Sequence, residues 1–167
     1  YRCINRLDRD TTGLTIVAKH ALAGGILGNA VAKRAIHRTY YAVCSGCTPA
    51  CMRISAPIAR KDASTIERCV DFKRGENAVT DFIRIKYNPD NNLSLVKLRL
   101  LTGRTHQIRV HMKYIGFPLI GDFLYNPDYT YISRQALHSG RLVFTHPVTG
   151  QKMNLISDIP SDMKSLF

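Results

Sequence analysis

Alternation between polar and apolar residues runs through much of this 167-residue chain and predicts a protein built mainly from β-strands. The clearest example is a β-hairpin, in which residues 81–87 and 93–101 alternate on either side of the turn-forming segment Asn88–Asn92. β-Branched, aromatic and apolar runs predict further strands at residues 14–18, 39–44, 137–145 and 152–156. Residues 47–57 are loop-like, and we expect a loop there.

Helical spacing occurs in two longer segments and one short one. Residues 20–36 place apolar side chains at helical intervals, although several glycines weaken this prediction. Residues 106–115 form a second predicted helix, and a short third helix is expected from Pro160. Hairpin-linked strands with few helices between them predict an α+β fold with a mixed, mainly antiparallel sheet and flanking helices. Because no repeat or linker is visible, we expect residues 1–167 to form a single domain.

The charge balance points to a polyanionic partner. Lys and Arg together number 24 against 12 for Asp and Glu, which gives a formal net charge of +12. The basic residues are interleaved with the apolar pattern and do not collect in one tail, so they belong to the folded surface. A merely solvated basic surface is the alternative, but a field of this sign and size favours nucleic acid.

The five cysteines bear on compartment and on metal binding. Cys44, Cys47 and Cys51 lie close together in the sequence, and Cys69 could supply a fourth zinc ligand. No second tight Cys or His pair completes the usual zinc-binding pattern, so we favour buried or loop thiols and expect no metal. An odd number of cysteines without a secretory leader predicts reduced thiols and a cytoplasmic location.

No uninterrupted apolar run approaches the roughly 20 residues that cross a bilayer, so we expect no membrane partner. The chain begins with Tyr1, without an initiator Met and without a charged-then-apolar leader. We therefore expect a non-secreted protein whose first residues either have been removed or are not included in this chain.

Three polar segments interrupt the predicted elements and carry the candidate chemistry. The first is R-L-D-R-D-T-T-G-L at residues 6–14, where Asp8 lies in a turn just before a strand and Arg6 is close beside it. A carboxylate in this position can enter a cleft, although an Asx-turn that organises the loop is the alternative. The second is R-T-Y-Y-A-V at residues 38–43. Neighbouring strand residues face opposite sides, so Tyr40 can line a pocket while Tyr41 packs in the core, or both can serve packing alone.

The third segment is T-G-R-T-H-Q-I-R-V-H-M at residues 102–112, which leads into a predicted helix. Helical spacing places His106, Arg109 and Lys113 on one polar face, opposite an apolar face. Thr105 is the predicted N-cap, and the free amides at that end would attract phosphate. A solvated basic face is the alternative, but the density of donors favours a binding site. Four donors fall within six residues: Arg104, His106, Gln107 and Arg109.

Together the three segments resemble the RluA-type family of pseudouridine synthases. The family motif R-L-D-x-x-T-x-G-L matches residues 6–14, a basic-x-Tyr-x-Ala motif matches residues 38–42, and T-G-R-T-H-Q-I-R-V-H matches residues 102–111 without a gap. The similarity covers almost the whole chain in the family's order, continuing through residues 116–125, 137–150 and 159–163. The resemblance implies the pseudouridine synthase catalytic fold with a central basic cleft. It also implies an isomerase that acts on specific uridines of ribosomal RNA or tRNA.

The resemblance further implies catalytic roles. Asp8 would be the catalytic carboxylate, kept ionised by an ion pair with Arg109, and Tyr40 would lie against the uracil and help remove the proton from carbon 5. The carboxylate could attack covalently or remove a sugar proton, and the sequence leaves both routes open. The reaction is an isomerisation without net oxidation, so we expect no cofactor.

RNA-holding roles are implied for a second group of residues. Arg6 would fill the space left when the target base leaves its stack, or hold the displaced strand. The neighbouring phosphates and bases would be held by Arg104, His106 and Gln107. We expect the protein to work as a monomer.

The chain departs from the family pattern in a few places. The family usually has His where this chain has Asn5, and Ser where it has Thr12, but neither change removes a catalytic group. We expect that the family's strand segment ahead of the first motif and any accessory RNA-binding domain are missing from this chain. An inactive RNA-binding module of the same fold is the alternative function, and the presence of Asp8, Tyr40 and Arg109 argues against it.

Overall fold

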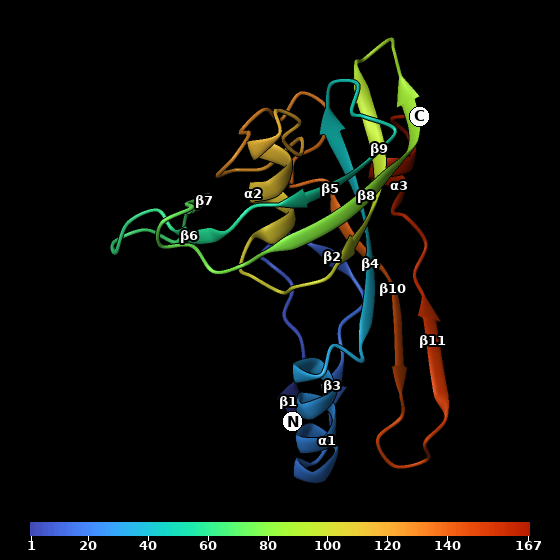
Figure 1. Ribbon diagram of the computed structural model, residues 1–167. Helices are drawn as coiled ribbons and strands as arrows, with labels where there is room; N and C mark the ends of the chain where they lie inside the picture. Colours follow the sequence, from blue (N-terminus) through green and yellow to red (C-terminus); the bar gives the residue numbers. More distant parts are fainter.

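A seven-stranded sheet forms the centre of the structure, a computed structural model that describes residues 1–167 (Figure 1). Its strands are β2 (Thr12–Gly13), β4 (His37–Ser45), β5 (Cys51–Ser55), β8 (Val79–Asn88), β9 (Leu93–Leu100), β10 (Leu137–Thr145) and β11 (Lys152–Ile156). They lie in the order β11-β10-β4-β9-β8-β5, with β2 alongside β10. All pairs are antiparallel except β2 with β10. The predicted α+β fold with a mixed, mainly antiparallel sheet is therefore confirmed.

Two small ribbons and three helices surround this sheet. The ribbons pair β1 (Arg2–Cys3) with β3 (Val17–Ala18), and β6 (Ile58–Arg60) with β7 (Arg68–Val70). The helices are α1 (Ala21–Ala32), α2 (Gln107–Tyr114) and α3 (Ser161–Lys164). In Figure 1 the β6–β7 ribbon projects to one side of the molecule, next to α2, and α1 lies beside β1 and β3 at the lower end. None of the helices has the length and apolar character needed to cross a membrane.

The hydrophobic core lies on both faces of the sheet, as strand alternation requires. On one face, Tyr40 and Ala42 of β4 pack in a cluster that includes Ile108 and Met112 of α2. On the other face, Val43 of β4 packs in a second cluster with residues near the C-terminus, and Tyr41 packs against it. The predicted opposite orientation of the two tyrosines is thus confirmed, and α2 covers the face to which Tyr40 belongs.

Most predicted strands are found where the alternation placed them. The hairpin of β8 and β9 is present, and β10 and β11 have the bounds that the sequence predicted. The prediction of a loop over residues 47–57 was wrong, because this segment contains β5. β5 lies at the edge of the sheet, is only five residues long and buries only Ile54, so the brief alternation of Met52-Arg53-Ile54-Ser55 is a weak signal. In the predicted strand at residues 14–18, only Val17–Ala18 forms a strand.

Candidate active site

A cavity of about 590 Å³ brings the three polar segments together. Its wall combines the loop before β2, the exposed start of β4, the turn at residues 102–105 and the start of α2. Asp8 is the only carboxylate in this wall. Six arginines line the same cavity: Arg6, Arg34, Arg38, Arg99, Arg104 and Arg109. The cavity is therefore the central basic cleft that the resemblance implied.

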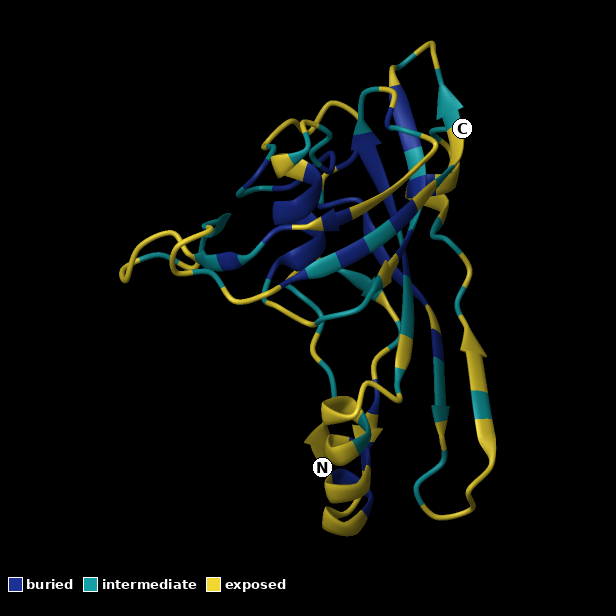
Figure 2. Ribbon diagram, in the orientation of Figure 1, coloured by how far each residue is buried: buried dark blue, intermediate teal, exposed yellow.

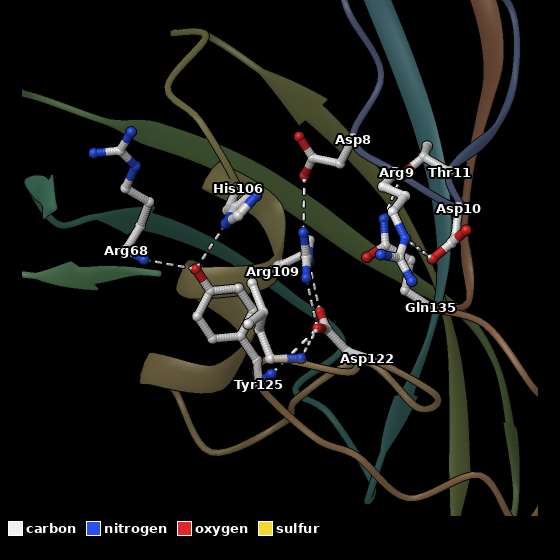
Figure 3. A network of polar contacts seen from close by, with 11 residues as sticks. Asp8, Arg9, Asp10, Thr11, Arg68, His106, Arg109, Asp122, Tyr125 and Gln135 are labelled. Atoms are coloured by element: carbon white, nitrogen blue, oxygen red, sulfur yellow. Dashed lines mark hydrogen bonds and ion pairs between the residues drawn. The ribbon is translucent and has the colours of Figure 1, made fainter. Parts of the chain in front are cut away.

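The loop that carries Asp8 is anchored to the sheet. Thr12 and Gly13 pair with His138 and Ser139 of β10 in parallel. Gly13 has a φ of +103°, and a Cβ added there would lie 2.2 Å from the carbonyl oxygen of Ser139, so only glycine fits. No amide of its own loop donates to the Asp8 carboxylate, which excludes the Asx-turn interpretation. The carboxylate points from this fixed loop toward α2 (Figure 3).

Arg109 lies between two carboxylates, as Figure 3 shows. Its Nε and Nη2 each donate to Asp122 at 2.7 Å, whereas its Nη1 donates to Asp8 Oδ2 at 3.3 Å. The side chains of Arg109 and Asp122 are 1% and 0% exposed, and that of Asp8 is 16% exposed. Asp122 thus holds Arg109 in place through two donors, and the remaining donor, Nη1, contacts Asp8. Of the two carboxylates, only that of Asp8 is accessible from the cavity.

The electrostatics of this trio keep Arg109 charged. Burial by itself lowers the pKa of Arg109, but the hydrogen bonds that it donates to Asp122 and the negative charges of Asp122 and Asp8 outweigh this effect, so the pKa is raised. The guanidinium also lies over the rings of Phe123 and Tyr125, with 5.3 Å and 4.9 Å from its central carbon to the ring centroids. Two carboxylates share one guanidinium here, and the other arginines of the cavity wall supply the remaining positive charge near Asp8.

Asp122 was not among the predicted site residues. It follows Gly121, which has a φ of +67° and lies so close to Arg134 that an added Cβ would be 2.1 Å from the Arg134 carbonyl oxygen. Asp122 Oδ1 also accepts the backbone N–H groups of Leu124 and Tyr125 at 3.0 and 3.2 Å. The G-D-F-L-Y segment is part of the family resemblance, which could have marked Asp122 as a site residue. The pairing of Asp122 with Arg109, however, depends on the tertiary fold.

Tyr40 lines the cavity from β4 and is almost fully buried. Burial raises its pKa, the positive charge of Arg38 works against this, and the negative charge of Asp8 adds to the rise. Its hydroxyl is therefore protonated at neutral pH. Tyr41, by contrast, packs on the opposite face of the sheet, where Gly140 leaves room for its ring.

The start of α2 differs from the prediction. His106, not Thr105, occupies the N-cap position, with a left-handed φ of 56° and no capping hydrogen bond from its side chain. His106 and Arg109 are also buried, so the predicted polar face is solvated only at Lys113. The segment that contains Asp122 and Tyr125 covers this face. The polar and apolar pattern of α2 alone could not show that another segment would pack there.

His106 is held by an aromatic partner. Its Nδ1 lies 2.9 Å from the hydroxyl of Tyr125, which also accepts the backbone N–H of Arg68 at 2.9 Å (Figure 3). Burial lowers the pKa of His106 more than the charge of Asp8 raises it, so the ring is neutral at pH 7. Burial raises the pKa of Tyr125 to about 12. His106 lines the cavity as a neutral ring close to Asp8.

The remaining predicted RNA-holding residues differ in how many contacts they make within the chain. The Gln107 amide is satisfied within the chain: its Oε1 accepts from Thr102 and from the Arg104 amide, and its Nε2 donates to Val79 O and Thr80 Oγ1. It therefore braces the turn at residues 102–105. Arg104 lines the cavity and pairs with exposed Glu76. Arg6 is exposed at the cavity wall and forms no ion pair.

The clustered cysteines lie apart from this cavity. Cys44 is buried in β4, which raises the pKa of its thiol, whereas Cys47 and Cys51 are exposed. Arg84 donates to Cys47 Sγ at 2.7 Å. No three His, Cys, Asp or Glu side chains gather in a group that could hold a metal ion.

Comparison with solved structures gives the fold. Human RNA Pseudouridylate Synthase Domain Containing 1 superposes with a TM-score of 0.82 at 26% identity, covering 94% of this chain and 68% of that one. Human RNA Pseudouridylate Synthase Domain Containing 4 superposes with a TM-score of 0.78 at 21% identity, covering 97% of this chain and 72% of that one. The predicted pseudouridine synthase fold is confirmed.

Curated relatives match along nearly the whole chain. Uncharacterized RNA pseudouridine synthase YjbO of Bacillus subtilis is 47% identical over 166 residues, covering 98% of this chain and 57% of that protein. Ribosomal large subunit pseudouridine synthase D of Zymomonas mobilis is 37% identical, covering 98% of this chain and 54% of that protein. The chain therefore spans about half the length of these relatives. The family model for RNA pseudouridylate synthase matches residues 1–114, and the chain belongs to that family.

Proposed function

We propose that this protein isomerises uridine within RNA to pseudouridine, with residues 1–167 as its catalytic domain and Asp8 as its catalytic carboxylate. The observation that carries this proposal is the position of Asp8. It is the only carboxylate in a cavity lined by six arginines, and a buried guanidinium lies 3.3 Å from it. A positively charged wall attracts the RNA backbone, and the carboxylate is placed where an inserted base and its sugar would lie.

The reaction breaks the bond between ribose carbon 1′ and uracil nitrogen 1, turns the base and joins carbon 1′ to carbon 5. A proton leaves carbon 5 and nitrogen 1 gains one, so nothing is oxidised or reduced. Asp8 acts either as a nucleophile or as a base toward the sugar, and both roles need the ionised form. Arg109 lies 3.3 Å from Asp8 as its counter-ion, and Asp122 holds Arg109 in place through two contacts of 2.7 Å.

Tyr40 lies against the uracil in this proposal. Because burial raises its pKa, it enters the reaction as a neutral phenol, which is a weak base. It therefore takes part in removing the carbon 5 proton as a relay: its oxygen accepts that proton while its own hydroxyl proton passes to solvent in the cavity, and nitrogen 1 gains a proton from the same solvent. Its buried position on β4 supports this placement beside the cavity.

The RNA around the target uridine is held by the cavity wall. Arg6, which has no ion-pair partner, fills the space left by the displaced base, and Arg104 contacts phosphate. His106 contacts a base with its neutral ring. Gln107 acts indirectly, by fixing the turn that carries Arg104.

We also propose that the substrate is ribosomal RNA, with tRNA as the alternative, and that the protein acts as a monomer in the cytoplasm. Relatives named ribosomal large subunit pseudouridine synthase D support the choice of RNA. The cavity is complete within one chain, which supports a monomer. All five cysteines are free, and three of them (Cys3, Cys47 and Cys51) are exposed, which fits a reducing compartment.

The test is release of tritium from RNA labelled at uracil carbon 5. Asp8→Asn keeps the size of the side chain but supplies neither nucleophile nor base, so release should fall to background. Asp10→Asn is the matched control: Asp10 lies in the same loop, pairs with exposed Arg9 and does not line the cavity. Its left-handed φ of 67° is one that asparagine tolerates. Release by Asp8→Asn at the rate of the parent and of Asp10→Asn would overturn the proposal.

A further inference from the structure

A second cavity of about 420 Å³ adjoins the first. The two share the turn Gly103–Thr105, which lines both. The other wall of the second cavity comes from the β6–β7 ribbon and the segment after it. Four arginines line it: Arg60, Arg68, Arg74 and Arg104. Glu76 is its only carboxylate, so this cavity too is strongly positive.

Two of these arginines are placed against each other. Arg60 of β6 and Arg68 of β7 are direct partners across the antiparallel ribbon. Like charges in this position destabilise a strand pair. The ribbon has only two strands and projects beside α2 (Figure 1), so its fold gains nothing from this arrangement. A pair of facing cations that the fold does not need indicates a bound anion.

The same two arginines lack carboxylate partners. Arg74 pairs with Asp71, and Arg104 pairs with Glu76. Arg60, however, donates only to the carbonyl oxygen of Ala63, and its 3.4 Å length makes that bond weak.

The guanidinium of Arg68 has fewer hydrogen-bond partners still. Its Nε is shielded from solvent and has no hydrogen-bond partner. Figure 3 shows its guanidinium pointing away from the network around Arg109, while only its backbone N–H bonds to Tyr125. A shielded, unpaired guanidinium donor costs free energy unless a ligand accepts its hydrogen bond.

We infer that Arg60 and Arg68 form a phosphate-binding site for the RNA strand next to the target uridine. This inference rests on the proposed function, because it takes the ligand of the first cavity to be RNA. Guanidinium groups bind phosphate oxygens in a bidentate manner, and two of them facing each other can enclose one phosphate. Since Arg104 lines both cavities, a strand whose target nucleotide occupies the first cavity can pass this arginine and reach the ribbon.

The test compares RNA affinity and folding stability in the full-length protein. Arg60→Ala and Arg68→Ala should each weaken binding of a stem–loop RNA by roughly tenfold, the lower range for a charge-assisted hydrogen bond. The dependence of log affinity on log salt should become shallower by about 0.7 for each lost contact to a single strand. The midpoint temperature of unfolding should stay the same or rise, because a repulsive pair has been removed. Arg60→Glu should raise it further while weakening binding most.

Two comparisons make this outcome specific. Lys152→Ala combined with Lys164→Ala removes two exposed charges on β11 and α3, on the far side of the molecule in Figure 1, and should leave RNA affinity near that of the parent. The nucleoside uridine carries no phosphate and can therefore engage only the first cavity, so it should bind the parent and both arginine variants alike.

Equal losses in the lysine and arginine variants would show that only net charge matters and would overturn the inference. So would unchanged RNA affinity in the arginine variants, an equal loss of uridine binding, or a fall in stability that matches the fall in affinity. Binding is measured without turnover. A parent protein that binds RNA through these arginines but releases no tritium would refute the proposed isomerisation and leave the phosphate site standing.

Discussion

The two longer helices reverse the usual relation between polarity and burial. α2 is rich in polar and charged residues, yet every residue from Gln107 to Met112 is buried. α1 consists almost wholly of small and apolar residues, yet Leu22 is 68% and Ile26 40% exposed. Figure 2 shows the contrast directly, with α2 mostly dark blue and α1 mostly yellow.

The difference lies in what each helix contacts. α1 packs on β3 and β10 through a narrow face, chiefly Ala23 and Leu27, and the rest of it is free. α2 is enclosed between the sheet and the segment around Asp122, and each buried polar side chain there has a partner. Burial of α2 therefore depends on pairing as much as on hydrophobicity, and breaking one pair should cost far more than changing α1.

The largest effect should follow from Asp122→Asn. It removes the negative charge that faces buried Arg109 through two contacts of 2.7 Å, and the single 3.3 Å contact to Asp8 cannot replace it. Breaking a buried ion pair in this way typically costs about 3–5 kcal/mol of unfolding free energy. Denaturant titration of the parent and the variant measures the loss.

The matched control is Asp162→Asn. Asp162 also receives two hydrogen bonds from one arginine, Arg134, each at 2.9 Å, but its side chain is 41% exposed. An exposed pair of this kind contributes less than about 1 kcal/mol. Similar losses from the two substitutions would mean that burial does not set the strength of the pairing in α2.

The second prediction concerns acid and uses His111 of α2. Burial lowers the pKa of this fully buried histidine, and hydrogen bonding to the carbonyl oxygen of Ala56 only partly offsets it. Below the unfolded pKa of about 6.5, the unfolded chain binds a proton that the folded protein does not. The contribution of neutral His111 to the unfolding free energy is thus fully present above about pH 6.5. It is lost as the pH falls toward the folded pKa, by up to about 1.4 kcal/mol per pH unit.

His111→Gln should therefore lower stability at neutral pH but make its decline from about pH 7 to about pH 5 shallower than in the parent. Burial also lowers the pKa values of His106 and His138, so these two residues cause the decline in unfolding free energy that remains in the variant. Met112→Ala, at the neighbouring buried position, is the control for a loss of packing alone, and its curve should run parallel to that of the parent. Parallel curves for His111→Gln as well would contradict the prediction.

The sequence predicted those features that one strand or one motif determines. β8 and β9 each bury mainly one face, which gives their sequences a period of two, and the motif loops keep the residue types that their chemistry needs. The position of Asp8 beside Arg109, 101 residues away, came only from the resemblance.

Features that depend on tertiary contacts between distant segments could not be predicted from the sequence pattern. The pairing of Arg109 with Asp122 needs the loop after α2 to fold back over the helix, and the facing of Arg60 and Arg68 needs the register of the β6–β7 ribbon. The burial of α2 has the same origin. Hydrophobic periodicity cannot distinguish a solvated polar face from one that another segment satisfies.

The smallest expected effect is a gain of stability in α1, from Gly25→Ala and Gly28→Ala. Both glycines lie inside the helix, and a Cβ added to either would meet no atom within 4 Å. Alanine lowers the conformational entropy of the unfolded chain, so each change should add roughly 0.5–1 kcal/mol to the unfolding free energy. Gly24→Ala is the control in the same helix, because its Cβ would lie 3.0 Å from Arg2 Cδ and the gain should shrink or vanish. A clear loss of stability from Gly25→Ala would mean that another surface covers this face of α1, and the contrast between a free apolar helix and an enclosed polar one would no longer hold.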